Sequence, residues 1–205
     1  MPTNDPTKRR AIYKTMRVYS GSSNRPLAQK IADILGVELS GLALEQFANG
    51  EIYARYEETV RGADVFLIQS IAGENVNDML MEVLVAADAA KRASARSITA
   101  VITHYGYARQ DRKAAPREPI TARLVADLLE CSGVNNIITL DLHQGQIVGF
   151  FDVPVNHLSA LPLFADYYNA MNLDKENLVV VSPDVGRAKA AKKLSDMLDC
   201  DLAIA

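Results

Sequence analysis

Apolar runs alternate with amphipathic segments along most of this chain. Residues 65–69, 98–102 and 137–140 are continuous apolar runs of the kind that form strands buried on both faces of a parallel sheet. Segments with helical periodicity lie between them, and polar loops mark each change. This order of strand, loop and helix predicts an α/β fold with a parallel sheet and right-handed crossovers.

Local start and stop signals refine the prediction. Val18 and Tyr19 suggest a short first strand, followed by a turn at residues 21–24. The Asn49-Gly50 pair predicts a hairpin whose second strand alternates apolar and polar positions. Three helices are expected in this part of the chain: residues 26–35 closed by Gly36, residues 79–92 capped by Asp78, and residues 120–130 opened by Pro119 and followed by Gly133.

The last fifty residues repeat the design on a smaller scale. A helix at 163–171, a strand at 178–181, a helix at 187–198 and a strand from 202 predict a β-loop-α-β unit. We therefore expect a loose arm at residues 1–15, one α/β domain at 16–160, and the beginning of a second domain of the same kind at 161–205.

Composition excludes several classes of protein. With 205 residues, 49% of them hydrophobic, the chain has material for a packed core. A net charge of -3 argues against nucleic acid or an anionic membrane as partner. No apolar run reaches membrane-spanning length, and none follows the basic residues 8–10, so neither a membrane span nor a signal peptide is expected. Cys131 and Cys200 fit reduced structural thiols, the histidines and cysteines show no zinc-site spacing, and the expected location is cytoplasmic.

Two strand ends carry candidate chemistry. Asp141 and His143 directly follow the strand at 137–140, and the charged run at 109–113 follows the strand at 98–102. Ligands bind at the carboxyl edge of open α/β sheets, so both loops are candidates. Taken singly, each loop also has an ordinary explanation. Asp141 could cap a turn beside a loop histidine, and residues 109–113 could be a solvated run of charges. The glycine-serine turn at 21–24 is expected to be structural, because it lacks a phosphate-loop lysine.

Several motifs together resemble ribose-phosphate pyrophosphokinases, from about Met16 to the last residue. The matching segments are GYARQDRK at 106–113, REPIT at 117–121, DLH at 141–143, QI at 146–147, GFFD at 149–152 and VSPD at 181–184. The resemblance implies phosphoribosyltransferase-like parallel-sheet domains, the second of them incomplete. It also implies that the family's basic loop and acidic phosphoribosyl loop lie beyond Ala205.

The resemblance also implies roles for individual residues. The hairpin tip would hold the adenine of ATP, with Phe47 stacking on the base and Asn49 and Glu51 reading its amino group. In the charged loop, the ATP-site residues would be Arg109 and Gln110, with Asp111 orienting the loop, and Arg117 would lie in a phosphate and subunit-contact region.

His143 and Asp184 resemble the pair that holds magnesium (Mg2+) together with the nucleotide phosphates. His143 and Arg109 resemble the catalytic residues of the family. Magnesium prefers oxygen ligands, so Asp184 is the stronger candidate for a metal ligand. The alternative role for His143 is a contact with a phosphate oxygen or a metal-bound water instead of the metal. His104 and His157 are expected to be structural. The chain departs from the family at His104, at Val148 and at Arg187.

The implied reaction transfers pyrophosphate from ATP to ribose 5-phosphate, giving phosphoribosyl pyrophosphate and AMP in a homohexamer built from dimers. The 205-residue portion alone is expected to be inactive. Two rival hypotheses are a non-catalytic regulatory homologue and a phosphoribosyltransferase. The second would not need an adenine-binding hairpin.

Overall fold

The computed structural model describes residues 16–205, so the arm expected at 1–15 lies outside the described residues. The chain divides into two compact units, one ending at Leu158 and the other comprising Ser159–Ala205. The boundary expected from the sequence lies two residues further along.

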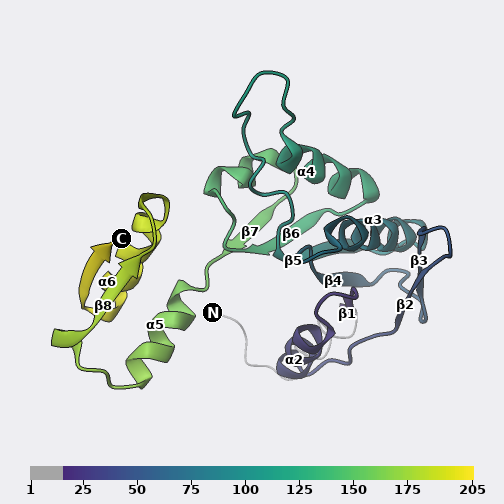
Figure 1. Ribbon diagram of the computed structural model, residues 1–205. Coiled ribbons are helices and arrows are strands. Elements are labelled where there is room, and N and C mark those ends of the chain that lie inside the picture. Colours follow the sequence, from purple (N-terminus) through teal and green to yellow (C-terminus); the bar gives the residue numbers. More distant parts are fainter. Residues whose placement is uncertain (1–15) are drawn as a thin grey trace. The chain divides into compact units, whose positions relative to one another are not determined.

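A five-stranded parallel sheet forms the centre of the first unit (Figure 1). Its strands lie in the order β1-β4-β5-β6-β7. They are β1 (Met16–Ser20), β4 (Asp64–Ser70), β5 (Ser97–His104), β6 (Asn136–Leu140) and β7 (Val155–Leu158). The three continuous apolar runs of the sequence are β4, β5 and β6, the central strands, which confirms the predicted α/β class.

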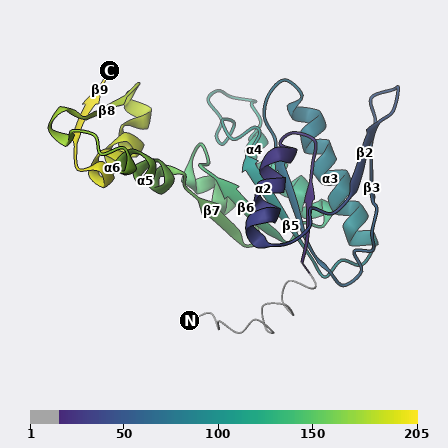
Figure 2. The ribbon, with the colours of Figure 1, turned by 90° about the horizontal axis from the view of Figure 1, so that it is seen from below.

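Helices cover both faces of this sheet. On one face lies α2 (Arg25–Leu35), and on the other lie α3 (Val76–Arg92) and α4 (Thr121–Ser132), as Figures 1 and 2 show from two directions. The contact faces are rich in alanine, and small residues let a helix approach the strands closely. The fully buried alanines are Ala28 and Ala32 of α2, Ala86, Ala87 and Ala90 of α3, and Ala122 and Ala126 of α4.

Helix starts differ from the sequence expectation in two places. Helix α3 is preceded by Asn75, and Asp78 lies in its first turn, so the prediction of Asp78 as the cap was wrong. A carboxylate in the first turn still interacts favourably with the helix dipole. Helix α4 begins at Thr121, one residue later than expected, and Gly133 closes it with φ 114° as predicted.

The expected hairpin joins β2 (Leu42–Gln46) to β3 (Ile52–Tyr56) in an antiparallel pair. Its base packs on α3, where the hydroxyl of Tyr56 donates to the carbonyl of Ala86 at 2.9 Å. Its far end projects beyond the sheet (Figure 2). The packed base thus supports an exposed tip.

In the second unit, β8 (Val179–Ser182) and β9 (Asp201–Ile204) pair in parallel, connected by α6 (Ala188–Leu198). Helix α5 (Leu161–Ala170) precedes β8 and begins and ends earlier than expected. The predicted β-loop-α-β unit is therefore confirmed. Both cysteines are free, and Cys131 is exposed at the end of α4.

None of the helices described within residues 16–205 has both the length and the apolar character needed to span a membrane.

Candidate functional site

The loops after β5 and β6 lie at one edge of the sheet. The two strands are parallel neighbours, with Ile102 of β5 opposite Thr139 of β6, so their carboxyl ends lie side by side. The first loop carries the charged run at 109–113, and the second carries Asp141 and His143. The structure therefore brings the two strongest sequence candidates to the same edge.

A close approach of two backbone segments fixes the start of the first loop. A Cβ atom added to Gly106 would lie 2.5 Å from Cγ2 of Ile71 and 3.0 Å from its carbonyl oxygen. Tyr105, the residue before Gly106, also holds the loop in place, because its buried hydroxyl donates to the carbonyl of Ala122 at 3.0 Å. Burial raises the pKa of Tyr105, so the hydroxyl keeps its proton and remains a donor.

We expect Gly106→Ala to destabilise the protein, because the added methyl group has no room beside Ile71. Overpacking of this kind costs about 1–3 kcal/mol of unfolding free energy, which is measured by denaturant titration. Gly149→Ala is the matched control, since nothing lies within 4 Å of the position of its added Cβ. Equal stability of the two variants would contradict the steric argument.

Two residues of the charged loop are engaged in holding the loop itself. The side chain of Gln110 accepts a hydrogen bond from the Thr121 hydroxyl, and its main-chain carbonyl accepts from the amide of Ala122 at 3.1 Å. Asp111 is 9% exposed, and its Oδ2 accepts from Nε2 of Gln146 at 3.3 Å. Asp111 therefore links the first loop to the second.

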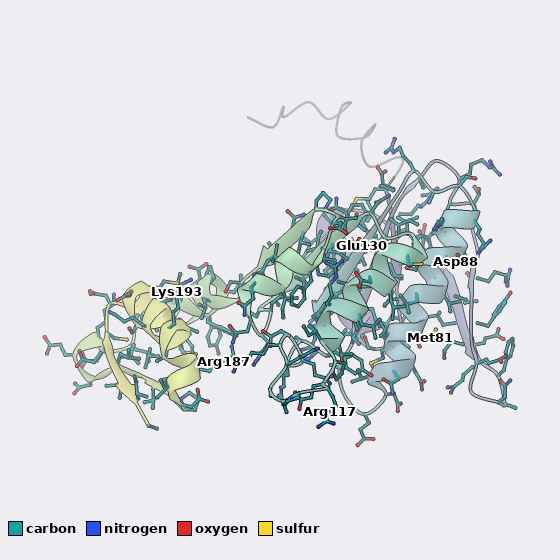
Figure 3. All side chains as sticks on the ribbon, turned by 90° about the horizontal axis from the view of Figure 1, so that it is seen from above. Met81, Asp88, Arg117, Glu130, Arg187 and Lys193 are labelled. Atoms are coloured by element: carbon teal, nitrogen blue, oxygen red, sulfur yellow. The ribbon has the colours of Figure 1, made fainter. Side chains whose placement is uncertain are left out.

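The cations of this loop point to solvent. Arg109, Arg112, Lys113 and Arg117 are exposed, and within residues 16–205 none of the four makes a hydrogen bond or an ion pair. Arg117 lies at the outer end of the loop (Figure 3). The loop thus presents four positive charges that the described part of the chain does not neutralise.

Glu118 folds the outer part of the same loop. Its Oε2 accepts hydrogen bonds from the main-chain amides of Ala114 and Ala115, at 2.7 and 2.8 Å. No role for Glu118 was predicted from the sequence, although a carboxylate three or four residues after a turn is a recognisable local signal. The basic loop is consequently a shaped element.

In the second loop, Asp141 has a left-handed backbone with φ 43°, an uncommon conformation for a residue other than glycine. Leu142 is buried at 7% exposure and anchors the loop in the core. His143 is exposed and makes no hydrogen bond within the described part of the chain. Its imidazole is thus available for a ligand.

The glycine-serine turn before α2 is filled by the protein's own side chains. Oε2 of Glu82 accepts from the amide of Ser22 at 3.0 Å, and Oε1 of Gln69 accepts from the amide of Ser23 at 3.1 Å. Amides that face a phosphate in other proteins are therefore already paired here. This agrees with the expected structural turn.

The hairpin tip presents an aromatic ring and a carboxylate. Phe47 is 50% exposed and packs against Tyr53, with ring centroids 5.9 Å apart. Oδ1 of Asn49 already accepts from the amide of Glu51 at 3.2 Å, so part of its acceptor capacity serves the turn. The exposed carboxylate of Glu51 is the freer acceptor for an amino group.

Asp184 belongs to the second unit and follows β8. Its Oδ1 accepts from the amide of Arg187 at 2.9 Å and caps a short 3-10 helix, η3 (Val185–Arg187). Within residues 16–205, no three histidine, cysteine, aspartate or glutamate side chains gather into a metal site.

The parallel sheet with this polar carboxyl edge is an α/β domain of the phosphoribosyltransferase type. Residues 16–133 match the N-terminal domain of ribose phosphate pyrophosphokinase, which is more than half of the chain. The chain belongs to the ribose-phosphate pyrophosphokinase family.

Individual relatives agree. The ribose-phosphate pyrophosphokinase of Fusobacterium nucleatum is 52% identical over 94% of this chain and 60% of that protein. Ribose-phosphate pyrophosphokinase 2 of Enterococcus faecalis is 52% identical over 92% of this chain and 58% of that protein. The crystal structure of phosphoribosylpyrophosphate synthetase from Mycobacterium smegmatis superposes with a TM-score of 0.87 and 46% identity, covering 93% of this chain and 63% of that one. The chain thus spans about three fifths of the length of these proteins.

Proposed function

We propose that the protein carrying this chain transfers pyrophosphate from ATP to the 1-hydroxyl of ribose 5-phosphate, giving phosphoribosyl pyrophosphate and AMP. The observation that carries the proposal is the unneutralised basic loop beside His143 at one sheet edge, in a chain of this family. Charge on the transferred group grows and spreads during the reaction, so fixed cations at this edge would stabilise it.

The hairpin and the loops have separate roles in this proposal. Phe47 stacks on adenine, and Glu51 accepts from its amino group. Arg109 neutralises charge on the phosphates, while Asp111, through Gln146, holds the loop in place. Gln110 accepts from Thr121 through its Oε1, so the hydrogens of its Nε2 are the donors that contact ATP.

In this proposal Asp184 would hold magnesium, and His143 is the second residue that the family resemblance assigns to the ion; each belongs to its own unit. Asp184 offers a carboxylate oxygen beyond the one used as a cap, whereas the imidazole of His143 is suited to a phosphate oxygen or a metal-bound water as well. The ion would supply charge neutralisation on the phosphates of ATP.

The location of the protein in the cytoplasm remains a prediction.

The test is an assay of the protein at the full length of its relatives, with ATP and ribose 5-phosphate supplied and AMP and phosphoribosyl pyrophosphate measured. Formation of both products in equal amounts is the expected result. ATP binding without product would favour the regulatory homologue. A second assay supplies a purine base and phosphoribosyl pyrophosphate, and formation of a nucleotide there would favour a phosphoribosyltransferase.

The proposal extends to assembly as a homohexamer built from dimers, in which the hairpin of one subunit reaches the nucleotide site of a neighbour. Phe47 is half-exposed, and the β2–β3 hairpin that carries it projects beyond the sheet (Figure 2), which supports such an arrangement. Native mass measurement of the full-length protein tests the hexamer. A monomer that turns over at full rate would contradict the shared site.

Phe47→Ala in the full-length protein is expected to weaken ATP binding by about 1–3 kcal/mol, the usual contribution of one base stacked on an aromatic ring. Calorimetric titration with ATP measures the change. Ile34→Ala is the matched control, because it removes another exposed apolar side chain, on α2. Equal affinity in both variants would remove Phe47 from the adenine site.

A further inference from the structure

One histidine outside the proposed machinery contacts the backbone of the loop that carries His143. His157 lies on β7 opposite Thr139 of β6, close to the sheet edge where that loop begins. Its Nε2 accepts a hydrogen bond from the main-chain amide of Leu142 at 3.0 Å. Leu142 is the residue between Asp141 and His143, so this bond acts on the peptide chain immediately before His143.

The loop needs this support because its backbone is unusual. Asp141 has φ 43°, and such a conformation in a residue other than glycine persists only where the surroundings enforce it. Two consecutive residues of β7 supply the restraint. The carbonyl of Leu158 accepts from the amide of Asp141 at 3.0 Å, and His157 accepts from the next amide.

The bond also defines the chemical state of His157. An imidazole nitrogen accepts a hydrogen bond only when it carries no hydrogen, so the tautomer that makes this bond has its hydrogen on Nδ1. The buried side chain of Leu142 keeps the donating amide close to the core, where an amide without an acceptor is costly.

We infer that His157 is a positioning residue: through the Leu142 amide it sets the direction in which the His143 imidazole leaves the sheet edge. The inference rests on the proposed function in assigning His143 to the site. Groups that orient a ligating or catalytic side chain without touching the substrate typically matter about 10-fold to 100-fold in activity.

The first test needs neither a variant nor activity. Nitrogen-15 NMR of the 205-residue chain should show the His157 tautomer with its hydrogen on Nδ1 and Nε2 as the acceptor. The Leu142 amide should exchange slowly with solvent. A hydrogen on Nε2, or fast exchange of that amide, would overturn the inference.

The second test compares His157→Phe, which keeps a planar ring without an acceptor, with His157→Gln, whose Oε1 reaches the place of Nε2. At full length, the Phe variant should lose turnover by about 10-fold to 100-fold, with KM for ATP little changed, and the Gln variant should recover most of the loss. Asn156→Ala is the control on the same strand. Equal turnover of the Phe variant and the unaltered protein would reject the inference.

The two proposals fail differently. If the unaltered full-length protein forms no phosphoribosyl pyrophosphate, the proposed function fails, and the inference is decided by the NMR signals of His143. These signals should move in the Phe variant and stay in place in the Gln and Asn156→Ala variants. Unmoved His143 signals in the Phe variant would show that His157 does not position it. If the Phe variant does not fold, the tautomer of His157 in the unaltered chain gives the decision.

Discussion

Asp184→Asn in the protein at the full length of its relatives is expected to cut turnover by about 100-fold or more, the scale of losing one electrostatic stabiliser. Asparagine retains an oxygen that can accept from the amide of Arg187 and cap η3, so the local fold should survive. What it removes is the negative charge. The variant therefore separates the structural role of Asp184, which the structure shows, from its proposed role as a magnesium ligand.

The measurement is a magnesium titration of the initial rate, with thermal unfolding alongside. We expect a higher magnesium concentration at half-maximal rate and an unchanged unfolding temperature. Asp174→Asn is the matched control, because Asp174 in the same unit also caps a short 3-10 helix, accepting from the amide of Glu176 at 3.2 Å. If both variants titrate alike, Asp184 holds no metal.

Arg109→Ala should lower turnover by about 100-fold to 1000-fold, because it removes a fixed cation from the place where charge develops. Its guanidinium makes no hydrogen bond within the described residues, so stability should not change. The rate with saturating ATP and ribose 5-phosphate reports the effect. Arg25→Ala, another exposed arginine at the start of α2, should leave the rate intact.

A second comparison distinguishes position from charge. Arg109→Lys keeps the positive charge but lacks the planar fork that pairs with two phosphate oxygens, so it should restore only part of the rate. Full recovery would mean that charge alone is needed. If Arg109→Ala retained the rate of the unaltered protein, the basic loop would have to act through its other cations.

The sequence alone predicted the α/β class, the central strands, the hairpin and the two candidate loops. Each of these follows from local patterns: the buried strands are continuous apolar runs because both of their faces are covered, and Gly50 takes the φ of 89° that its turn requires. Helix starts were less accurate. Asn75 precedes α3 and makes no side-chain cap bond, so the polar signal at Asp78 misled the prediction.

The tertiary structure alone decided which polar groups remain available to a ligand. Glu82 fills the turn at Ser22 across 60 residues, Asp111 meets Gln146 across 35, and His157 meets Leu142 across 15. No hydrophobic period or turn signal encodes such pairings, because they depend on which strands become neighbours in the sheet. Most buried polar groups find partners once the sheet forms, and the contacts named here hold the two loops on which His143 and Arg109 remain exposed.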